Sequence, residues 1–186
     1  MLDQIRKALK DQGGPLYGVV EVDAGYVGGV NQKNEKKFLN KAALMVAVKR
    51  NVEMRAEAVP DLTRPEVQKF LHKNVKQGSI LLTDNASSYK TAAFGYDRMH
   101  VNHGKGEYER GGVHINRVET FFSHLKRSLK GTHKSISKAH LQSYLDGFVF
   151  HYNMRHSDKM RFDALFGALL RFGEQKGTSS GSLAQV

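Results

Sequence analysis

Apolar residues recur at two different periods along the chain, and their order predicts a mixed α/β domain. Short apolar runs predict β-strands over residues 17–23, 43–50, 52–60, 79–84 and, more weakly, 98–103. Helical spacing predicts a helix over residues 64–75, a short helix before the last strand, and three helices from His114 to near Phe172. Early adjacent strands followed by alternating strands and helices favour a mixed sheet with helices against its faces.

Glycine, proline and serine divide the chain into three parts. Residues 1–14 predict a short amphipathic helix that the Gly13-Gly14-Pro15 sequence ends, residues 15–172 carry all the predicted strands and the longer helices, and residues 173–186 predict a flexible Gly/Ser-rich tail. No cysteine is present, which excludes a disulfide framework and a cysteine-ligated zinc site. No apolar run approaches the roughly 20 residues of a membrane span, so we expect a cytoplasmic protein without a membrane partner.

The charge of the chain favours a nucleic-acid partner. Lysine and arginine number 29 against 18 aspartate and glutamate residues, which gives a formal net charge of +11. An excess of this size attracts phosphate backbones, although a basic surface kept for solubility is the open alternative.

Two aspartates follow apolar runs in separate predicted strands. Asp23 ends the run 17–23, and Asp84 ends the run 79–84. The first is therefore expected at or near the end of a central strand, where the side chains of neighbouring strands can meet. Taken singly, each also fits a structural role, Asp23 as a strand-end cap and Asp84 as a helix N-cap.

A third acid lies on a predicted amphipathic helix. At about 100° per residue, one arc of this helix is polar, with Asn116, Glu119, Ser123, Lys126 and Lys130. The opposite arc is apolar, with Val118, Phe121, Phe122, Leu125 and Leu129. The helix can bury the second arc while Glu119 lines a cleft, or the polar arc can simply be solvated.

Three carboxylates in a basic protein predict a metal site that acts on phosphodiesters. Magnesium prefers oxygen ligands and needs few protein carboxylates, and paired ions can activate a hydroxyl and stabilise a leaving oxygen. We expect Mg²⁺ (or Mn²⁺) to be held by Asp23, Asp84 and Glu119. Phosphate contacts are expected from the basic run Lys126, Arg127, Lys130 and Lys134, for which a solvated surface is the alternative.

Three segments resemble DDE transposases of bacterial insertion sequences: VEVDAGYVGG, LLTDNASSY and the long block from HVNHGKGEYERGG through HINRVETFFSHLKR to HYNMR. The resemblance implies a ribonuclease H-like fold, with C-terminal helices, and a catalytic domain that cleaves and transfers DNA strands in transposition. It also implies a catalytic set of Asp23, Asp84 and the pair Asn116 and Glu119. Glu119 is favoured over Asn116 as the third metal ligand because a carboxylate neutralises metal charge better than an amide. DNA, as transposon ends and target, is the implied partner, and a homo-oligomer on DNA the implied assembly.

Departures from the family pattern leave alternatives open. Ala24 stands where an acidic residue often follows the first aspartate, and no CxxC-bearing zinc ribbon of the similar subgroup precedes the domain. The chain therefore resembles an N-terminally truncated copy in which residues 1–14 are a remnant helix. An inactive remnant that only binds DNA nonspecifically is one alternative, and a ribonuclease that acts on RNA–DNA hybrids is another.

Overall fold

The computed structural model describes residues 9, 13–28, 41–49, 52–84, 89, 92–100, 116–132 and 138–179. Within these ranges the side chains of residues 100, 116, 130–132, 138–139, 168 and 171–179 are outside the description. The predicted N-terminal helix and Lys134 also lie outside the described residues, as does most of the short helix that precedes the last strand.

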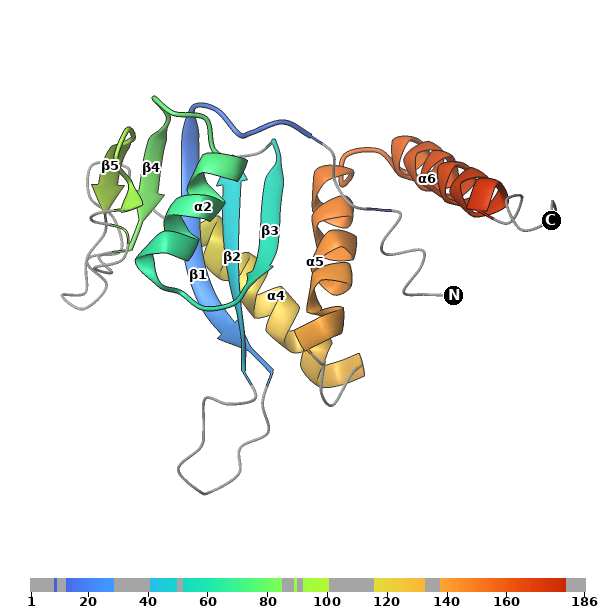
Figure 1. The fold of residues 1–186 in the computed structure, drawn as a ribbon, viewed down its shortest axis with the longest axis horizontal. Coiled ribbons are helices and arrows are strands. Elements are labelled where there is room, and N and C mark those ends of the chain that lie inside the picture. Colours follow the sequence, from blue (N-terminus) through green and yellow to red (C-terminus); the bar gives the residue numbers. More distant parts are fainter. Residues whose placement is uncertain are drawn as a thin grey trace, which may run out of the picture.

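A five-stranded sheet forms the centre of the molecule (Figure 1). Its strands are β1 (Val19–Val27), β2 (Ala42–Lys49), β3 (Met54–Val59), β4 (Ile80–Thr83) and β5 (Asp97–His100), in the spatial order β3-β2-β1-β4-β5. The first three strands pair antiparallel, whereas β4 lies parallel to β1 and β5 lies parallel to β4. This order and these directions are those of the ribonuclease H-like fold, so the predicted fold class is confirmed.

Helices cover both faces of the sheet. The described helices are α2 (Arg64–Asn74), α4 (Asn116–Thr132), α5 (Lys138–Asn153) and α6 (Asp158–Ser179). In Figure 1, α2 lies in front of the sheet and α4 behind it. On the face of the sheet that α4 covers, the predicted apolar arc of this helix packs against alternate residues of β2, among them Leu44, Val46 and Val48. On the opposite face, α2 packs against the sheet through Val67, Phe70 and Leu71, which recur at helical spacing.

The open edge of β3 is closed by two side-chain amides of α5. Gln142 accepts a hydrogen bond from the Ala58 backbone N–H (2.8 Å) and donates one to the Ala56 carbonyl (3.2 Å). Asn153 does the same for Met54, accepting from its N–H at 2.8 Å and donating to its carbonyl at 3.2 Å. The backbone N–H and C=O groups of an uncovered edge strand can pair with a strand of another chain. The two amides occupy such groups of β3, as a neighbouring strand would.

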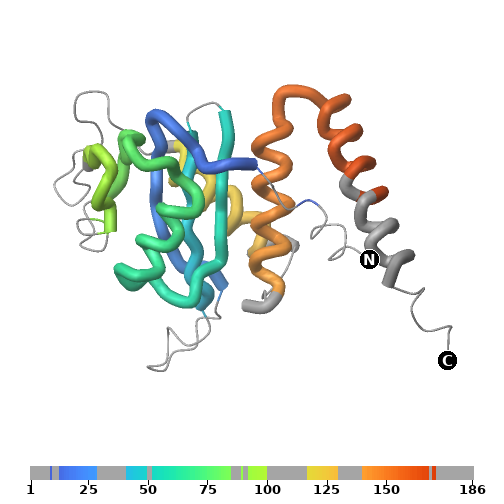
Figure 2. The backbone as a smooth tube through the Cα atoms, turned by 45° about the horizontal axis from the view of Figure 1, so that its top comes forward, coloured from blue at the N-terminus to red at the C-terminus, as the bar shows by residue number. Residues whose placement is uncertain are grey.

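Helix α6 leaves the end of α5 and projects away from the sheet in both views (Figure 2). It continues to Ser179, past the end near Phe172 that the sequence pattern indicates. Several of its large apolar side chains are exposed, including Met160, Phe162 and Phe166. None of the helices in the described part of the chain combines the length and apolarity that a membrane span requires.

Candidate active site

Asp23 lies in the middle of β1, not at its end. The strand continues to Val27 because β1 keeps pairing with β2 beyond the last residue that it pairs with β4, which is Glu21. The prediction that Asp23 ends its strand is therefore wrong, because β1 continues beside β2. Asp23 does lie close to the point where the pairing of β1 with β4 ends. Asp23 is half-buried, and its Oδ1 accepts a hydrogen bond of 2.7 Å from the Ala24 N–H.

Asp84 follows directly after β4 on the strand neighbouring Asp23. The parallel register pairs Val20 with Leu81 and Glu21 with Leu82. The recorded pairing ends there, and Asp84 follows the last residue of β4. Continued by two residues, the same register would bring Asp84 beside Asp23, since neighbouring strands are about 4.8 Å apart. Asp23 lies on the same face of β1 as Glu21 and Gly25, which is the face that α4 covers.

The charges of both aspartates act on one buried tyrosine. Tyr89 is 2% exposed, and its hydroxyl has no hydrogen-bond partner among the described residues. Burial raises the pKa of Tyr89 well above its usual value, and the negative charges of Asp23 and Asp84 raise this pKa further. Both carboxylates therefore lie within electrostatic reach of the same hydroxyl group.

Two contacts fix α4 against β1 on either side of Asp23. Before it along the strand, the carboxylate of Glu21 accepts a hydrogen bond of 3.1 Å from the backbone N–H of Arg117. After it, Gly25 packs against the Phe122 ring so closely that a Cβ at this glycine would lie 2.9 Å from Phe122 Cε1. Glu119 lies between Arg117 and Phe122 on α4, as Asp23 lies between Glu21 and Gly25 on β1.

The described side chains of the polar arc of α4 are exposed, as either a cleft lining or a solvated surface requires. Glu119, Lys126 and Arg127 are exposed, and the Lys126 ammonium lies 5.8 Å from the centre of the Phe122 ring. Asn116 is the first residue of the helix and Lys130 belongs to its last turns, but the side chains of both are outside the described part of the structure.

The three predicted ligands do not form one closed group. No cluster of three or more histidine, aspartate or glutamate side chains among the described residues is placed to hold a metal ion. The structure thus places Asp23 on β1, Asp84 directly after the neighbouring strand β4, and Glu119 on the helix that covers this face of the sheet. Oxygen donors of this kind match the preference of magnesium, which binds proteins through one or two carboxylates together with water and phosphate.

Arg98 is a site residue that the sequence pattern does not reveal. Its Nε donates to Thr83 Oγ1 (2.8 Å) and its Nη2 to the Asp84 carbonyl (2.7 Å). Desolvation lowers the pKa of the Arg98 guanidinium, and the Asp84 charge opposes this shift. Arg98 therefore holds the end of β4 that carries Asp84. A basic residue in a short strand carries no signal of such a role, because the contact depends on the pairing of β4 with β5.

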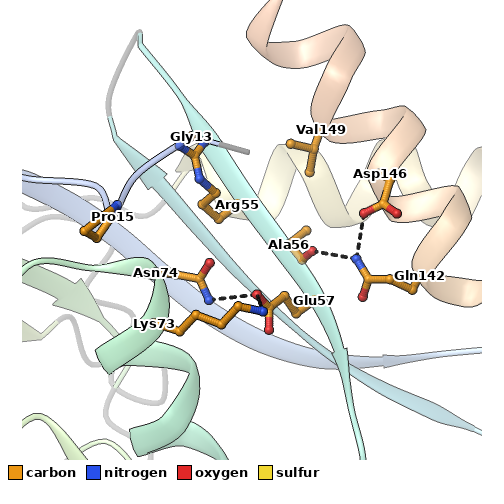
Figure 3. A pocket seen from close by; sticks show the side chains of 10 residues that line it. All are labelled: Gly13, Pro15, Arg55, Ala56, Glu57, Lys73, Asn74, Gln142, Asp146 and Val149. Carbon is orange, nitrogen blue, oxygen red and sulfur yellow. Dashed lines mark hydrogen bonds and ion pairs between the residues drawn. The ribbon is translucent and has the colours of Figure 1, made fainter. Parts of the chain in front are cut away.

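A pocket of about 370 Å³ lies at the opposite edge of the sheet (Figure 3). It is bounded by β3, the end of α2 and α5. Its charged groups are paired within it: Lys73 Nζ lies 2.6 Å from Glu57 Oε1, and Asp146 accepts a hydrogen bond of 2.8 Å from Gln142. This pocket is separated from Asp23 by the width of β2 and has no part in the acidic site.

Comparison with solved structures gives weak similarity to retroviral proteins. A chain of the simian T-cell lymphotropic virus intasome, solved in complex with PP2A regulatory subunit B56 gamma, is 14% identical with a TM-score of 0.46. The match covers 76% of this chain and 50% of the viral one, so this chain spans about half the length of that relative. The catalytic core domain of BIV integrase is 14% identical with a TM-score of 0.47, over 87% of this chain and 97% of the core.

Sequence comparison identifies the family. No curated protein matches the chain significantly. The profile of the ISXO2-like transposase domain, however, matches residues 15–153, which include the whole sheet together with α4 and α5. The match extends over most of the chain and contains Asp23, Asp84 and Glu119. The chain therefore belongs to the ISXO2-like family of DDE transposase domains, which are DNA-acting catalytic domains of the polynucleotidyl transferase class.

Proposed function

We propose that Asp23, Asp84 and Glu119 form the catalytic site at which this domain cleaves DNA strands and transfers their 3′ ends. The observation that supports this assignment best is the parallel register of β1 with β4, which, if continued by two residues, would bring Asp23 and Asp84 together. The docking of α4 between Glu21 and Gly25 adds Glu119 from the facing helix. Membership of the transposase family supplies the class of reaction.

Divalent metal ions are general cofactors of this class of enzyme, and the donor set fits them. Asp23 and Asp84 offer hard carboxylate oxygens, which are the ligands that magnesium prefers. Mg²⁺ or Mn²⁺ bound here would supply the positive charge that activates a hydroxyl and stabilises the leaving oxygen. Carboxylates repel one another at short range, and a bound cation would offset that repulsion between Glu119 and the two aspartates.

Each residue of the proposed site has a distinct role. Asp23 and Asp84 hold the cation from the rigid sheet, and Glu119 completes its ligands from the start of α4. Asn116, one helical turn before Glu119, is the alternative ligand. Lys126 and Arg127 are exposed on the same helix and are placed to contact the phosphates of the bound strand, followed along the chain by Lys130 and Lys134.

The substrate in this proposal is duplex DNA that carries transposon ends, together with a target duplex. Joining two ends to one target requires two active sites, so we propose a homo-oligomer assembled on DNA. The net charge of +11 favours association with either duplex.

Strand cleavage of labelled duplex DNA in Mg²⁺ tests the proposal. Asp23→Asn, Asp84→Asn and Glu119→Gln keep the size of each side chain and remove its charge, so each should lower cleavage by about 100-fold or more, the loss of transition-state charge stabilisation. Asp158→Asn is the matched control, since Asp158 is exposed at the start of α6, remote from the sheet. Equal cleavage by all three site variants and the wild type would refute the assignment; DNA binding without any cleavage by the wild type would favour a nonspecific DNA-binding role.

A further inference from the structure

Glu21 is a buried carboxylate on the face of β1 that α4 covers. Its side chain is 1% exposed, and it is among the largest fully buried side chains of the described residues. Its paired neighbours across the sheet are Val48 on β2 and Leu82 on β4, both buried and apolar. An apolar residue would suit this position for packing alone, because a buried carboxylate is costly unless hydrogen bonds satisfy it.

The hydrogen bond from Arg117 gives this carboxylate a function. Arg117 is the second residue of α4, and its N–H is one of the first-turn donors that have no acceptor within the helix. A carboxylate at this point also interacts favourably with the positive end of the helix dipole. The bond therefore joins a fixed position on β1 to the first turn of α4.

This bond sets the place of Glu119 relative to Asp23. Glu119 follows Arg117 by two residues, about 3 Å along the helix axis, and Asp23 follows Glu21 by two residues on the strand. The second contact, of Phe122 with Gly25, limits rotation and sliding at the other side. Apolar packing alone is non-directional, so the first contact adds a directional restraint at the start of α4.

We propose that Glu21 is a positioning residue of the catalytic site, which holds the first turn of α4 through the Arg117 N–H and so fixes where Glu119 lies relative to Asp23. The proposal rests on the assignment of Asp23 and Glu119 as metal ligands. It gives Glu21 no contact with the metal ion or with DNA.

Two substitutions of Glu21 separate this role from others. Glu21→Gln keeps an acceptor oxygen for the Arg117 N–H, whereas Glu21→Leu removes it and keeps the volume. In the Mg²⁺-dependent cleavage assay, we expect kcat of Glu21→Gln to stay within about threefold of wild type and kcat of Glu21→Leu to fall by about 10- to 100-fold, as for a small misplacement of a catalytic group. The KM for DNA should change little in both. Equal loss of activity in the two variants would overturn the proposal, because it would indicate that the charge itself acts.

Arg117 allows the same bond to be removed from the helix side. Arg117→Pro deletes the N–H at a position where proline is tolerated in a helix, and Arg117→Ala is its control because it deletes the side chain alone. We expect Arg117→Pro to lose activity to the same extent as Glu21→Leu, and the double variant to lose no more than either, since both changes break one interaction. Full activity of Arg117→Pro, or additive losses in the double variant, would contradict the proposal.

Circular dichroism and thermal unfolding show whether each variant is folded. If Glu21→Leu does not fold, the comparison of Arg117→Pro with Arg117→Ala still decides the question, because Glu21 is intact in both. The wild type and Asp23→Asn separate the two claims. An inactive wild type contradicts the proposed function, whereas an active wild type, an inactive Asp23→Asn and a fully active Glu21→Leu contradict the positioning role alone.

Discussion

Asp23 and Asp84 show what a single residue in a strand can and cannot reveal. Both follow apolar runs, which predicts the strands that carry or precede them but not that β1 continues past Asp23 to Val27. Their proximity depends on which strands are neighbours, and only the parallel register of β1 with β4 supplies that. Arg98 escapes prediction for the same reason, since its hydrogen bonds to Thr83 and Asp84 depend on the pairing of β5 with β4.

From the raised pKa of the single residue Tyr89, we predict that the protein loses stability in alkaline solution. The pKa of Tyr89 is raised in the folded state and near 10 in the unfolded chain, so the stability it gives is complete below pH 10 and declines as the pH rises further. For the wild type, this contribution to the free energy of unfolding should fall by up to about 1.4 kcal/mol per pH unit above pH 10.

Tyr89→Phe keeps the buried ring and removes the ionisable hydroxyl. Urea unfolding of both proteins between about pH 8 and pH 11 should therefore give a shallower decline for Tyr89→Phe. Tyr96→Phe serves as the comparison. Tyr96 is less buried than Tyr89, and burial alone raises its pKa, so its removal should change the decline less. Identical declines for the wild type and Tyr89→Phe would show that the hydroxyl ionises equally well in the folded protein.

Whole elements are predicted well where one face is apolar. The buried apolar residues of α2 and α4 recur at helical spacing, and in α5 the apolar side chains Leu141, Leu145 and Val149 are likewise buried at that spacing. Element ends are predicted less well. Gly25 suggests a turn in the sequence, yet it lies within β1, because the missing side chain makes room for the Phe122 ring.

Because Gln142 of α5 pairs with the backbone of the edge strand β3, we predict that its loss lowers the stability of the protein. Gln142→Leu leaves the Ala58 N–H and the Ala56 carbonyl without their side-chain partner, and such groups cost about 1–3 kcal/mol when they stay buried. We expect urea unfolding to show a loss of this size, and light scattering to show association through the exposed edge. Gln68→Leu on α2 is the control and should change neither quantity; wild-type stability in Gln142→Leu would mean that water replaces the amide at no cost.

The molecule as a whole combines a strongly basic chain with a pair of aspartates at one point of its sheet. Composition and the long block around Glu119 were sufficient to predict the family and the fold, because both depend on features spread over the entire chain. The predicted zinc-ribbon subgroup, truncation, flexible tail and cytoplasmic location stay predictions.

From the positive charge of α4, we predict how DNA affinity depends on salt. Lys126 and Arg127 are exposed beside the proposed site, so their replacement should reduce the number of neutralised phosphates by up to two. Fluorescence anisotropy at increasing salt should then show a slope of log K against log salt that is smaller by up to about 1.8 for Lys126→Gln/Arg127→Gln. Lys69→Gln on α2, which covers the other face of the sheet, should leave the slope nearly unchanged. The wild-type slope in the double variant would place the DNA elsewhere.

The most direct test of the acidic site is calorimetric titration of Mn²⁺ into the protein with a short DNA duplex present. The wild type should bind the ion, and Asp23→Asn/Asp84→Asn, if folded by circular dichroism, should lose that binding because both sheet ligands are neutral. Asp158→Asn should bind as the wild type does. Unchanged binding in the Asp23→Asn/Asp84→Asn variant would contradict the central claim that these two aspartates hold the catalytic metal.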